Sequence, residues 1–201
     1  TYLPELYKLV LKQSSEFLKE TLNEQQRKFR KRSRPKILLA TNLDDALNMY
    51  SKYKHNLLGV ISDVGFTVHK DDSPEMEKLD AGIELVRHIK ADNEKMPILL
   101  QSSQDSISSV AQELGVGFLR KYSKTLMLQL ADFIKEEFGF GDFVFRDADH
   151  VEYGRAANLK ELEAMVREVT DEVLLFNRSK NMLSTWFMDR GLLTLGERFR
   201  T

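Results

Sequence analysis

The sequence predicts an α/β fold in which parallel strands alternate with helices, followed by a smaller α+β segment. Between residues 36 and 138, short apolar runs alternate with longer amphipathic helical patterns. Such alternation is typical of a parallel sheet that is covered by helices on both faces. Beyond residue 138 the pattern changes to a β-hairpin followed by helices. We therefore divide the chain into a first domain, residues 1–138, and a C-terminal segment, residues 139–201.

The composition limits the classes of function that the chain can serve. Its 30 lysines and arginines nearly balance its 31 aspartates and glutamates, so no overall positive charge attracts nucleic acid or a membrane. No apolar run approaches the roughly 20 residues that span a bilayer, and no signal-peptide pattern is present. The chain has no cysteine, which excludes a thiolate site and fits a reducing compartment. We expect a cytoplasmic protein that binds neither nucleic acid nor membranes.

Residues 2–33 carry the pattern of one long helix. Apolar side chains recur at helical spacing, Pro4 lies in the first turn, and Pro35 ends the pattern. At about 1.5 Å per residue this helix would be roughly 48 Å long, which is more than one small domain can cover. Its last turns, residues 27–34, are basic and form either a solvated helix end or a partner-binding surface. The helix is thus a candidate for linking domains or for pairing two subunits.

The elements after Pro35 follow in a regular order. Strands are expected at 36–40, 57–62, 97–103 and 116–121, and helices at 44–53, 82–92, 106–115 and 124–138. The polar residues 67–80 are expected to form a loop, and Gly115 closes the helix that precedes the last strand.

Three of these strands end in residues with charged or reactive side chains. Asp63 follows LLGVIS, Ser102 follows PILLQ, and Lys121 ends VGFLRK. Ligands of open parallel sheets bind at the carboxyl ends of the strands. A carboxylate, a hydroxyl and an ammonium that meet there suit a phosphoryl group, because the carboxylate can attack phosphorus while the other two groups hold the phosphate oxygens. In the alternative interpretation, Asp63 caps a loop. The four histidines lack ligand spacing and are interpreted as surface residues.

Because Asp63, Ser102 and Lys121 follow three strands in this order, the first domain resembles a bacterial response-regulator receiver domain. ATNLDDAL, residues 40–47, is similar to the junction of the second strand and second helix of receivers. DAGIEL, residues 80–85, is similar to the stretch that enters their third helix. The resemblance implies a flavodoxin-like, doubly wound parallel sheet.

The resemblance also implies a role for each site residue. Asp63 takes the place of the phospho-acceptor, and Lys121 that of the phosphate-binding lysine. Ser102 lies at the position of the switch hydroxyl and Phe118 at that of the switch aromatic. Mg²⁺ would be held by Asp63, by the backbone of Gly65 and by acidic residues at the end of the first strand.

The sequence departs from the receiver pattern in three respects. Too few positions separate Asn42 from Asp63 for residues 36–40 to be the first strand, so we interpret them as the second. We therefore expect the first strand, with its acids, upstream of Thr1. The loop after Asp63 is longer than in receivers, and Tyr122 stands where receivers have a proline, which weakens the case for efficient phosphorylation.

A narrower resemblance concerns the setting of the domain. RPKILLA, NLLGVISDV, LLQSS and FGFGDFVFR are similar to the regulatory front end of large bacterial proteins with a phosphoenolpyruvate-synthase-like, or pyruvate-phosphate-dikinase-like, region. No such catalytic region is present in the sequence, so we do not expect the chain itself to be an enzyme. The resemblance implies a histidine kinase or a small phosphodonor as partner, and a linked output domain.

The C-terminal segment begins with a predicted hairpin over residues 138–156, with its turn at DADH. Asn158 can cap a helix over 159–169, and residues 171–191 are interpreted as helical, with Trp186 in the core. The segment resembles a small appended segment of bacterial signalling proteins, which often has a histidine where this chain has Asn177. A winged DNA-binding domain is disfavoured, because residues 138–201 carry 9 basic and 11 acidic residues, a net charge of 9 − 11 = −2.

Two functions follow from the sequence. In the first, the chain is a signal receiver that accepts a phosphoryl group on Asp63 and changes its contacts with a linked or partner domain. In the second, it is a phosphorylation-independent pseudo-receiver that serves as a dimerisation or interaction scaffold.

Overall fold

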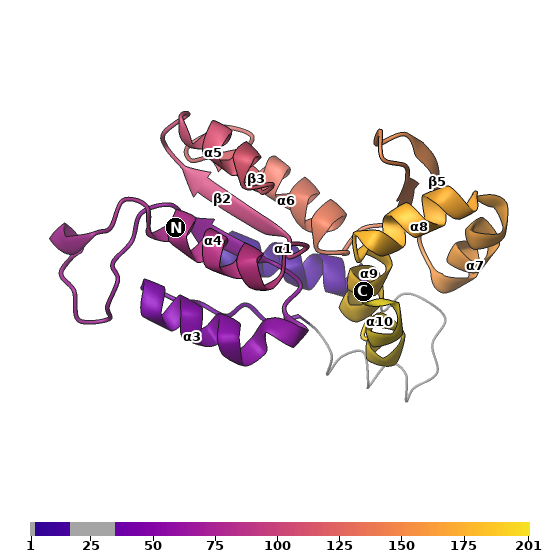
Figure 1. Cartoon of the computed structure of the whole chain (residues 1–201), viewed down its shortest axis with the longest axis horizontal. Coiled ribbons are helices and arrows are strands. Elements are labelled where there is room, and N and C mark those ends of the chain that lie inside the picture. The colour runs from indigo at the N-terminus through magenta and orange to yellow at the C-terminus, as the bar shows by residue number, and fades with distance from the viewer. Residues whose placement is uncertain (1–2, 17–34) are drawn as a thin grey trace. The chain divides into compact units, whose positions relative to one another are not determined.

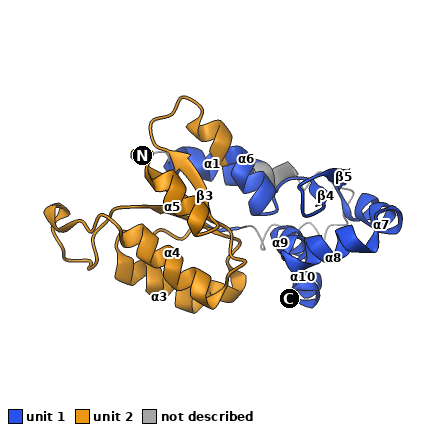
Figure 2. Ribbon diagram, turned by 45° about the horizontal axis from the view of Figure 1, so that its top comes forward, with its two compact units in different colours: residues 1–36, 131–201 blue, residues 37–130 orange. Residues whose placement is uncertain are grey.

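The chain forms two compact units, which Figure 2 shows in different colours. The computed structural model describes residues 3–16 and 35–201. The sheet unit comprises Ile37–Leu130, and the hairpin unit comprises Thr1–Lys36 together with Ala131–Thr201. No helix in the described part of the chain is long and apolar enough to cross a membrane.

The sheet unit confirms the predicted α/β class with a parallel sheet (Figure 1). Its elements are α3 (Leu43–Tyr53), β1 (Val60–Asp63), α4 (Ala81–Asp92), β2 (Ile98–Ser102), α5 (Ile107–Glu113), β3 (Gly117–Arg120) and the first part of α6 (Leu126–Glu137). Short 3-10 helices lie at Lys54–Asn56 and Pro74–Met76. The three strands are parallel and adjacent in the order β1-β2-β3, so β2 is the central strand.

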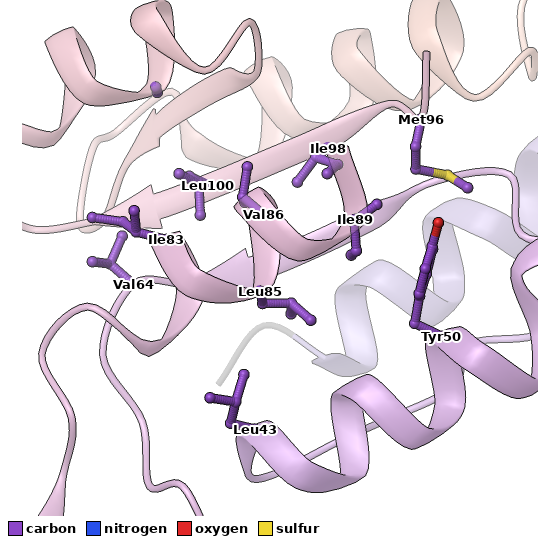
Figure 3. Close-up of a cluster of buried hydrophobic side chains, with 11 residues drawn as sticks. Leu43, Tyr50, Val64, Ile83, Leu85, Val86, Ile89, Met96, Ile98 and Leu100 are labelled. Carbon is purple, nitrogen blue, oxygen red and sulfur yellow. The ribbon is translucent and has the colours of Figure 1, made fainter. Parts of the chain in front are cut away.

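One face of this sheet carries the core of the unit. Val60 is in register with Ile98, and Leu100 with Phe118, so these side chains share a face. Helices α3, α4 and α5 cover that face, and Figure 1 shows α3 and α4 side by side. The buried cluster, drawn in Figure 3, consists of Leu43, Tyr50, Val64, Ile83, Leu85, Val86, Ile89, Met96, Ile98, Leu100 and Ala111. Burial of one large aliphatic side chain stabilises a fold by about 1.5–3 kcal/mol, so this cluster fixes the helices on the sheet.

The strand predicted at residues 36–40 does not form. Residues 35–40 have no regular secondary structure, and no hydrogen bond joins their backbone to another described residue. The physical reason is that a strand requires a neighbour: β1 pairs with β2 on one side only, and residues 36–40 do not pair with its other edge.

The predicted helix over residues 2–33 is described in its first half only. Helix α1 spans Leu3–Glu16, with Pro4 in its first turn as expected. Residues 17–34, and with them the basic stretch 27–34, lie outside the described residues. The long helix and its pairing of subunits therefore remain predictions.

The hairpin unit continues from α6 with a two-stranded antiparallel sheet. The strands are β4 (Phe143–Arg146) and β5 (Glu152–Ala156), which confirms the predicted hairpin. Helix α7 (Leu159–Glu168) begins at Asn158, whose side chain accepts hydrogen bonds from the amides of Lys160 and Glu161. The prediction of this helix and of its cap is thus confirmed.

The helical character predicted for residues 171–191 is confirmed, but the segment is divided into two helices. The structure has α8 (Asp171–Ser179) and α9 (Met182–Asp189), and a further helix, α10 (Leu193–Phe199), that was not predicted from the sequence. The break falls at Asn181, whose φ of 57° lies in the left-handed region. Asparagine is one of the few residues that adopts this conformation readily, so it ends the helix without a glycine.

Buried polar side chains hold the hairpin unit together. Trp186 is buried, and its Nε1 donates a hydrogen bond of 3.0 Å to the carbonyl oxygen of Gly141. The Arg190 guanidinium lies 3.6 Å from the centre of the Trp186 ring and donates to the carbonyl oxygens of Gly139 and Gly141, both at 2.9 Å. These contacts attach α9 to the chain segment between α6 and β4.

Asn177, where related segments were expected to show a histidine, has a structural role here. Its side chain is fully buried, and Nδ2 donates to the carbonyl oxygens of Arg146 and Val173, both at 2.7 Å. The amide therefore ties α8 to the end of β4.

Candidate phosphoryl-acceptor site

The carboxyl edge of the parallel sheet brings together an acid and a base from the two outer strands. Asp63 ends β1 and Lys121 follows β3, and Lys121 Nζ lies 3.1 Å from Asp63 Oδ1. Asp63, Gln101 and Leu119 are in register across the sheet, so their side chains leave the same face. Lys121 follows Leu119 by two residues, and its amide continues the ladder by donating to the Ser102 carbonyl oxygen at 2.8 Å. Strand alternation thus directs the lysine toward the acid.

This ion pair is open to solvent rather than buried. The side chain of Asp63 is 47% exposed and that of Lys121 is 30% exposed. Partly exposed ion pairs of this kind stabilise a fold by only about 0–1 kcal/mol. The pair therefore contributes little to folding, while both groups stay within reach of a ligand from solution.

A glycine sets the position of the strand end that carries Asp63. The amide of Gly82, in the first turn of α4, donates a hydrogen bond of 2.8 Å to the carbonyl oxygen of Val64. A Cβ atom at position 82 would overlap the carbonyl oxygen of Asp63. Only glycine allows α4 to approach the backbone of Asp63 this closely.

Ser102 lies at the same sheet edge, but its hydroxyl group does not contact the ion pair. It ends β2 and is in register with Arg120, which places its side chain on the face opposite to that of Gln101 and Asp63. Its hydroxyl oxygen accepts a hydrogen bond of 3.1 Å from the amide of Gln104, and no hydrogen bond connects it with Asp63 or Lys121. The convergence expected from the sequence is therefore seen for the carboxylate and the ammonium alone.

The two remaining sequence-predicted site residues have clear positions. Phe118 is partly buried and packs against the core cluster on the face that α3, α4 and α5 cover. Gly65 lies two residues after Asp63, and the carboxylate of Glu77 occupies the space that a Cβ of residue 65 would fill. No sequence pattern indicates this contact between Glu77 and Gly65, because Glu77 belongs to the irregular loop between β1 and α4.

The ligands expected for Mg²⁺ are incomplete in the described residues. Within residues 3–16 and 35–201, no group of three or more His, Cys, Asp or Glu side chains is arranged to hold a metal ion. Asp63 offers one carboxylate and Gly65 a backbone carbonyl, whereas Mg²⁺ requires six oxygen ligands from protein, water and phosphate. The further acids that the receiver resemblance places upstream of Thr1 lie outside the described residues. We therefore assign no chemical step to the metal.

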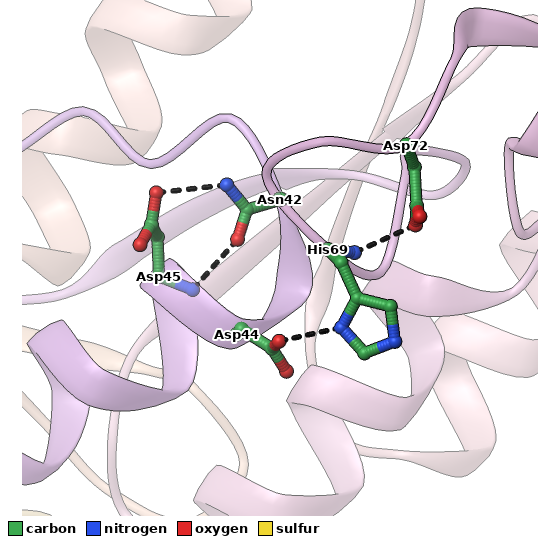
Figure 4. Close-up of polar contacts among 5 residues, drawn as sticks. All are labelled: Asn42, Asp44, Asp45, His69 and Asp72. Carbon is green, nitrogen blue, oxygen red and sulfur yellow. Dashed lines mark hydrogen bonds and ion pairs between the residues drawn. The ribbon is translucent and has the colours of Figure 1, made fainter.

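The loop between β1 and α4, predicted as irregular, is held by hydrogen bonds and ion pairs within the loop and with α3 and α4. Phe66 and Lys78 exchange two backbone hydrogen bonds, and Lys78 forms an ion pair with Glu84. His69 Nδ1 lies 2.7 Å from Asp44 Oδ2, as Figure 4 shows. This hydrogen bond with the Asp44 carboxylate raises the pKa of His69 above its ordinary value. The histidine is exposed, as expected, but it attaches the loop to the first turn of α3.

Asn42, next to this contact, is a helix cap. Its Oδ1 accepts a hydrogen bond of 2.8 Å from the amide of Asp45, and its Nδ2 donates one of 2.8 Å to the Asp45 carboxylate (Figure 4). The buried Asn42 side chain therefore provides a hydrogen-bond acceptor for a backbone N–H in the first turn of α3, which has no partner within the helix.

Comparison of the chain with protein-family models, with curated proteins and with solved structures finds no match.

Proposed function

We propose that the sheet unit is a receiver-type module of flavodoxin-like topology that accepts a phosphoryl group on Asp63. The observation that carries the proposal is the contact of 3.1 Å between Lys121 Nζ and Asp63 Oδ1 at the carboxyl edge of a parallel sheet. Ligands of such sheets bind at this edge. An exposed carboxylate beside an ammonium provides a nucleophile and a cation that can bind the transferred phosphate.

The proposed reaction is a simple group transfer. An oxygen of the Asp63 carboxylate attacks the phosphorus atom of a phosphohistidine or of a small acyl phosphate. A new O–P bond forms on Asp63, the bond from phosphorus to the donor breaks, and the donor departs with the electron pair of that bond. The Lys121 ammonium, already beside the carboxylate, stabilises the added negative charge by a charge-assisted hydrogen bond.

The receiver resemblance assigns the consequences of this transfer to Ser102 and Phe118. Ser102 would turn its hydroxyl toward a phosphate oxygen, and Phe118, near the start of β3, would become more deeply buried. The surface formed by residues 102–122 would then contact a linked output domain or a partner differently. In this proposal the donor is a histidine kinase or a small phosphodonor, and the setting is a cytoplasmic signalling protein with a phosphoenolpyruvate-synthase-like region.

The test is a thermal melt of the full chain with beryllofluoride, which mimics an acyl phosphate, in a buffer that contains Mg²⁺. A ligand at about 100 times its dissociation constant stabilises the fold that binds it by roughly 2.7 kcal/mol. We expect a higher melting temperature for the natural chain and no change for Asp63→Asn. Asp105→Asn is the matched control, because Asp105 is an exposed carboxylate paired with Arg120, 3.2 Å away, at the same end of the sheet.

The outcomes separate the two functions. A shift that Asp63→Asn abolishes and Asp105→Asn retains supports the acceptor site. No shift in the natural chain contradicts it and favours the alternative, a phosphorylation-independent scaffold.

A further inference from the structure

Tyr122 has a backbone conformation that a tyrosine does not favour. Its φ of 64° lies in the left-handed region, which bulky residues rarely adopt. The other non-glycine residues with positive φ in the described part of the chain are His150 and Asn181. Histidine and asparagine are several times more frequent in this region than other residues, so they occupy it at little cost. Tyrosine is strained there, and strained residues cluster at functional sites.

Burial does not compensate for the strain at Tyr122. The residue is 90% exposed, more than any other large apolar residue among those that the structure describes. Within residues 3–16 and 35–201, its side chain makes no hydrogen bond and no contact with another aromatic ring. The side chain therefore does not stabilise the fold. A role in binding a ligand accounts better for a strained and exposed aromatic residue at this position.

The backbone on both sides of Tyr122 is held at the carboxyl edge of the sheet. On one side, the amide of Lys121 donates a hydrogen bond of 2.8 Å to the carbonyl oxygen of Ser102. On the other side, the hydroxyl of Ser123 accepts a hydrogen bond of 3.2 Å from the amide of Thr125. Consecutive Cα atoms are about 3.8 Å apart, so the tyrosine lies directly beside the lysine of the ion pair. A ligand that approaches this edge from solution can therefore meet the Tyr122 ring.

We propose that Tyr122 is a specificity-determining residue of the acceptor site, and that its ring contacts the imidazole ring of a phosphohistidine donor. The inference rests on the proposed function of Asp63 and goes beyond it, because it names a residue that distinguishes between two classes of phosphodonor. Aromatic rings attract each other in offset-stacked or edge-to-face arrangements. A small acyl phosphate has no ring, so the contact with Tyr122 favours donors that contain imidazole.

The contact with Tyr122 strengthens as the phosphoryl group leaves the donor. The O–P bond forms on Asp63 while the P–N bond of the donor breaks. The imidazole nitrogen keeps the electron pair of that bond and takes up a proton from water. When the other ring nitrogen already carries a proton, the departing ring is a cation, and the face of a tyrosine ring attracts cations. The tyrosine thus stabilises the leaving group as well as the bound donor.

Two small donors with a P–N bond separate the effect of the ring from that of the reaction. N-phosphoimidazole contains the imidazole ring, and phosphoramidate has no ring. The full chain is incubated with each donor and Mg²⁺, and mass spectrometry measures the rate of phosphorylation at Asp63. We expect the ratio of the two rates, phosphoimidazole over phosphoramidate, to fall about tenfold in Tyr122→Asn, which lacks the ring and tolerates the left-handed backbone. Tyr122→Phe should keep the ratio.

The matched control is Leu79→Asn, which removes another exposed apolar side chain, 75% exposed in the natural chain, and should leave the ratio unchanged. The inference is overturned if Tyr122→Asn leaves the ratio unchanged or slows both donors equally, since the tyrosine would then act only on the fold or not at all. It is also overturned if Leu79→Asn lowers the ratio as much as Tyr122→Asn. Transfer from neither donor to the natural chain would contradict the proposed function of Asp63, and this inference with it.

Discussion

The amide of Gly82 donates a hydrogen bond of 2.8 Å to the carbonyl oxygen of Val64, and this contact places the start of α4 directly against the end of β1. The approach is so close that a Cβ atom on residue 82 would overlap the carbonyl oxygen of Asp63. The position of the candidate acceptor is therefore set by packing of one helix on one strand end.

Gly82→Ala should displace α4 from β1 and lower the free energy of unfolding. Overpacking of this kind costs about 1–3 kcal/mol, because the obstructing atoms belong to the backbone and cannot rotate away. Chemical denaturation measures the loss. The matched control is Gly115→Ala: a Cβ on residue 115 meets no atom, although its φ of 63° still strains alanine. A change at Gly82 that leaves both stability and the Asp63–Lys121 contact intact would contradict this packing.

Lys121→Met should separate the role of the ammonium in ligand binding from its role in folding. The ion pair with Asp63 is partly exposed, so its loss should change the free energy of unfolding by less than about 1 kcal/mol. The melting shift produced by beryllofluoride should be lost almost completely, because the cation that faces the ligand is gone. A variant that keeps the full shift would show that Lys121 does not contact the bound group.

The contact between His69 and Asp44 should weaken as the pH rises. The hydrogen bond with Asp44 raises the pKa of His69, so the folded state favours the protonated ring. The stabilisation is therefore fully present below the ordinary pKa of about 6.5 and is lost as the pH passes through the raised value. Exchange of the Leu43 and Asp44 amides, which donate to Thr67 and Val68 across the same contact, reports on it.

Two variants remove the contact, and each of them replaces one of its two partners. After correction for intrinsic exchange, protection of the two amides should fall with pH in the natural chain. It should be low and independent of pH in both His69→Gln and Asp44→Asn. If His69→Gln keeps the pH dependence of the natural chain, another group holds the loop to α3.

Asp189 should destabilise the hairpin unit when it ionises. Both carboxylate oxygens are buried without a hydrogen-bond partner in the described structure, and burial raises the pKa of this carboxyl well above its ordinary value. Arg190, 3.9 Å away, opposes the shift but directs its guanidinium at backbone carbonyls. Because the folded state binds the proton more tightly, stability should fall as the pH rises above the unfolded-state pKa of about 3.9.

Asp189→Asn keeps the shape of this side chain and removes the charge. The variant should melt at a higher temperature than the natural chain at neutral pH, by roughly 2–4 °C for each kcal/mol gained. The difference should shrink as the pH falls toward the unfolded-state pKa of about 3.9 and vanish below about pH 3, where the natural carboxyl is protonated in both states. A variant that is less stable at neutral pH would mean that the carboxylate is ionised and paired with Arg190.

The sequence predicted those parts of the fold that depend on local patterns. The run PILLQS predicted β2 because a continuous apolar segment suits a strand buried on both faces, and Asn158 predicted the start of α7 through its capping side chain. The strand at 36–40 was predicted from the same kind of run and does not form. Its composition was suitable, but strand formation depends on a neighbour that a local pattern does not reveal.

The site was predictable to the extent that strand ends determine it. Asp63 and Lys121 were expected to meet because parallel strands end at one edge, and they do. Ser102 does not join them, because strand alternation turns its side chain to the other face. The contact of His69 with Asp44 joins residues 25 positions apart through a loop of irregular conformation, and no periodic pattern indicates such a contact.

The most direct test of the central claim is detection of phosphoryl transfer to Asp63. The full chain is incubated with acetyl phosphate and Mg²⁺, reduced with borohydride to convert any acyl phosphate into a stable product, and examined by peptide mass spectrometry. The account predicts reduction of a single carboxyl, at Asp63, which is absent without acetyl phosphate and in Asp63→Asn. An unmodified Asp63 under conditions that phosphorylate a known receiver domain would contradict it.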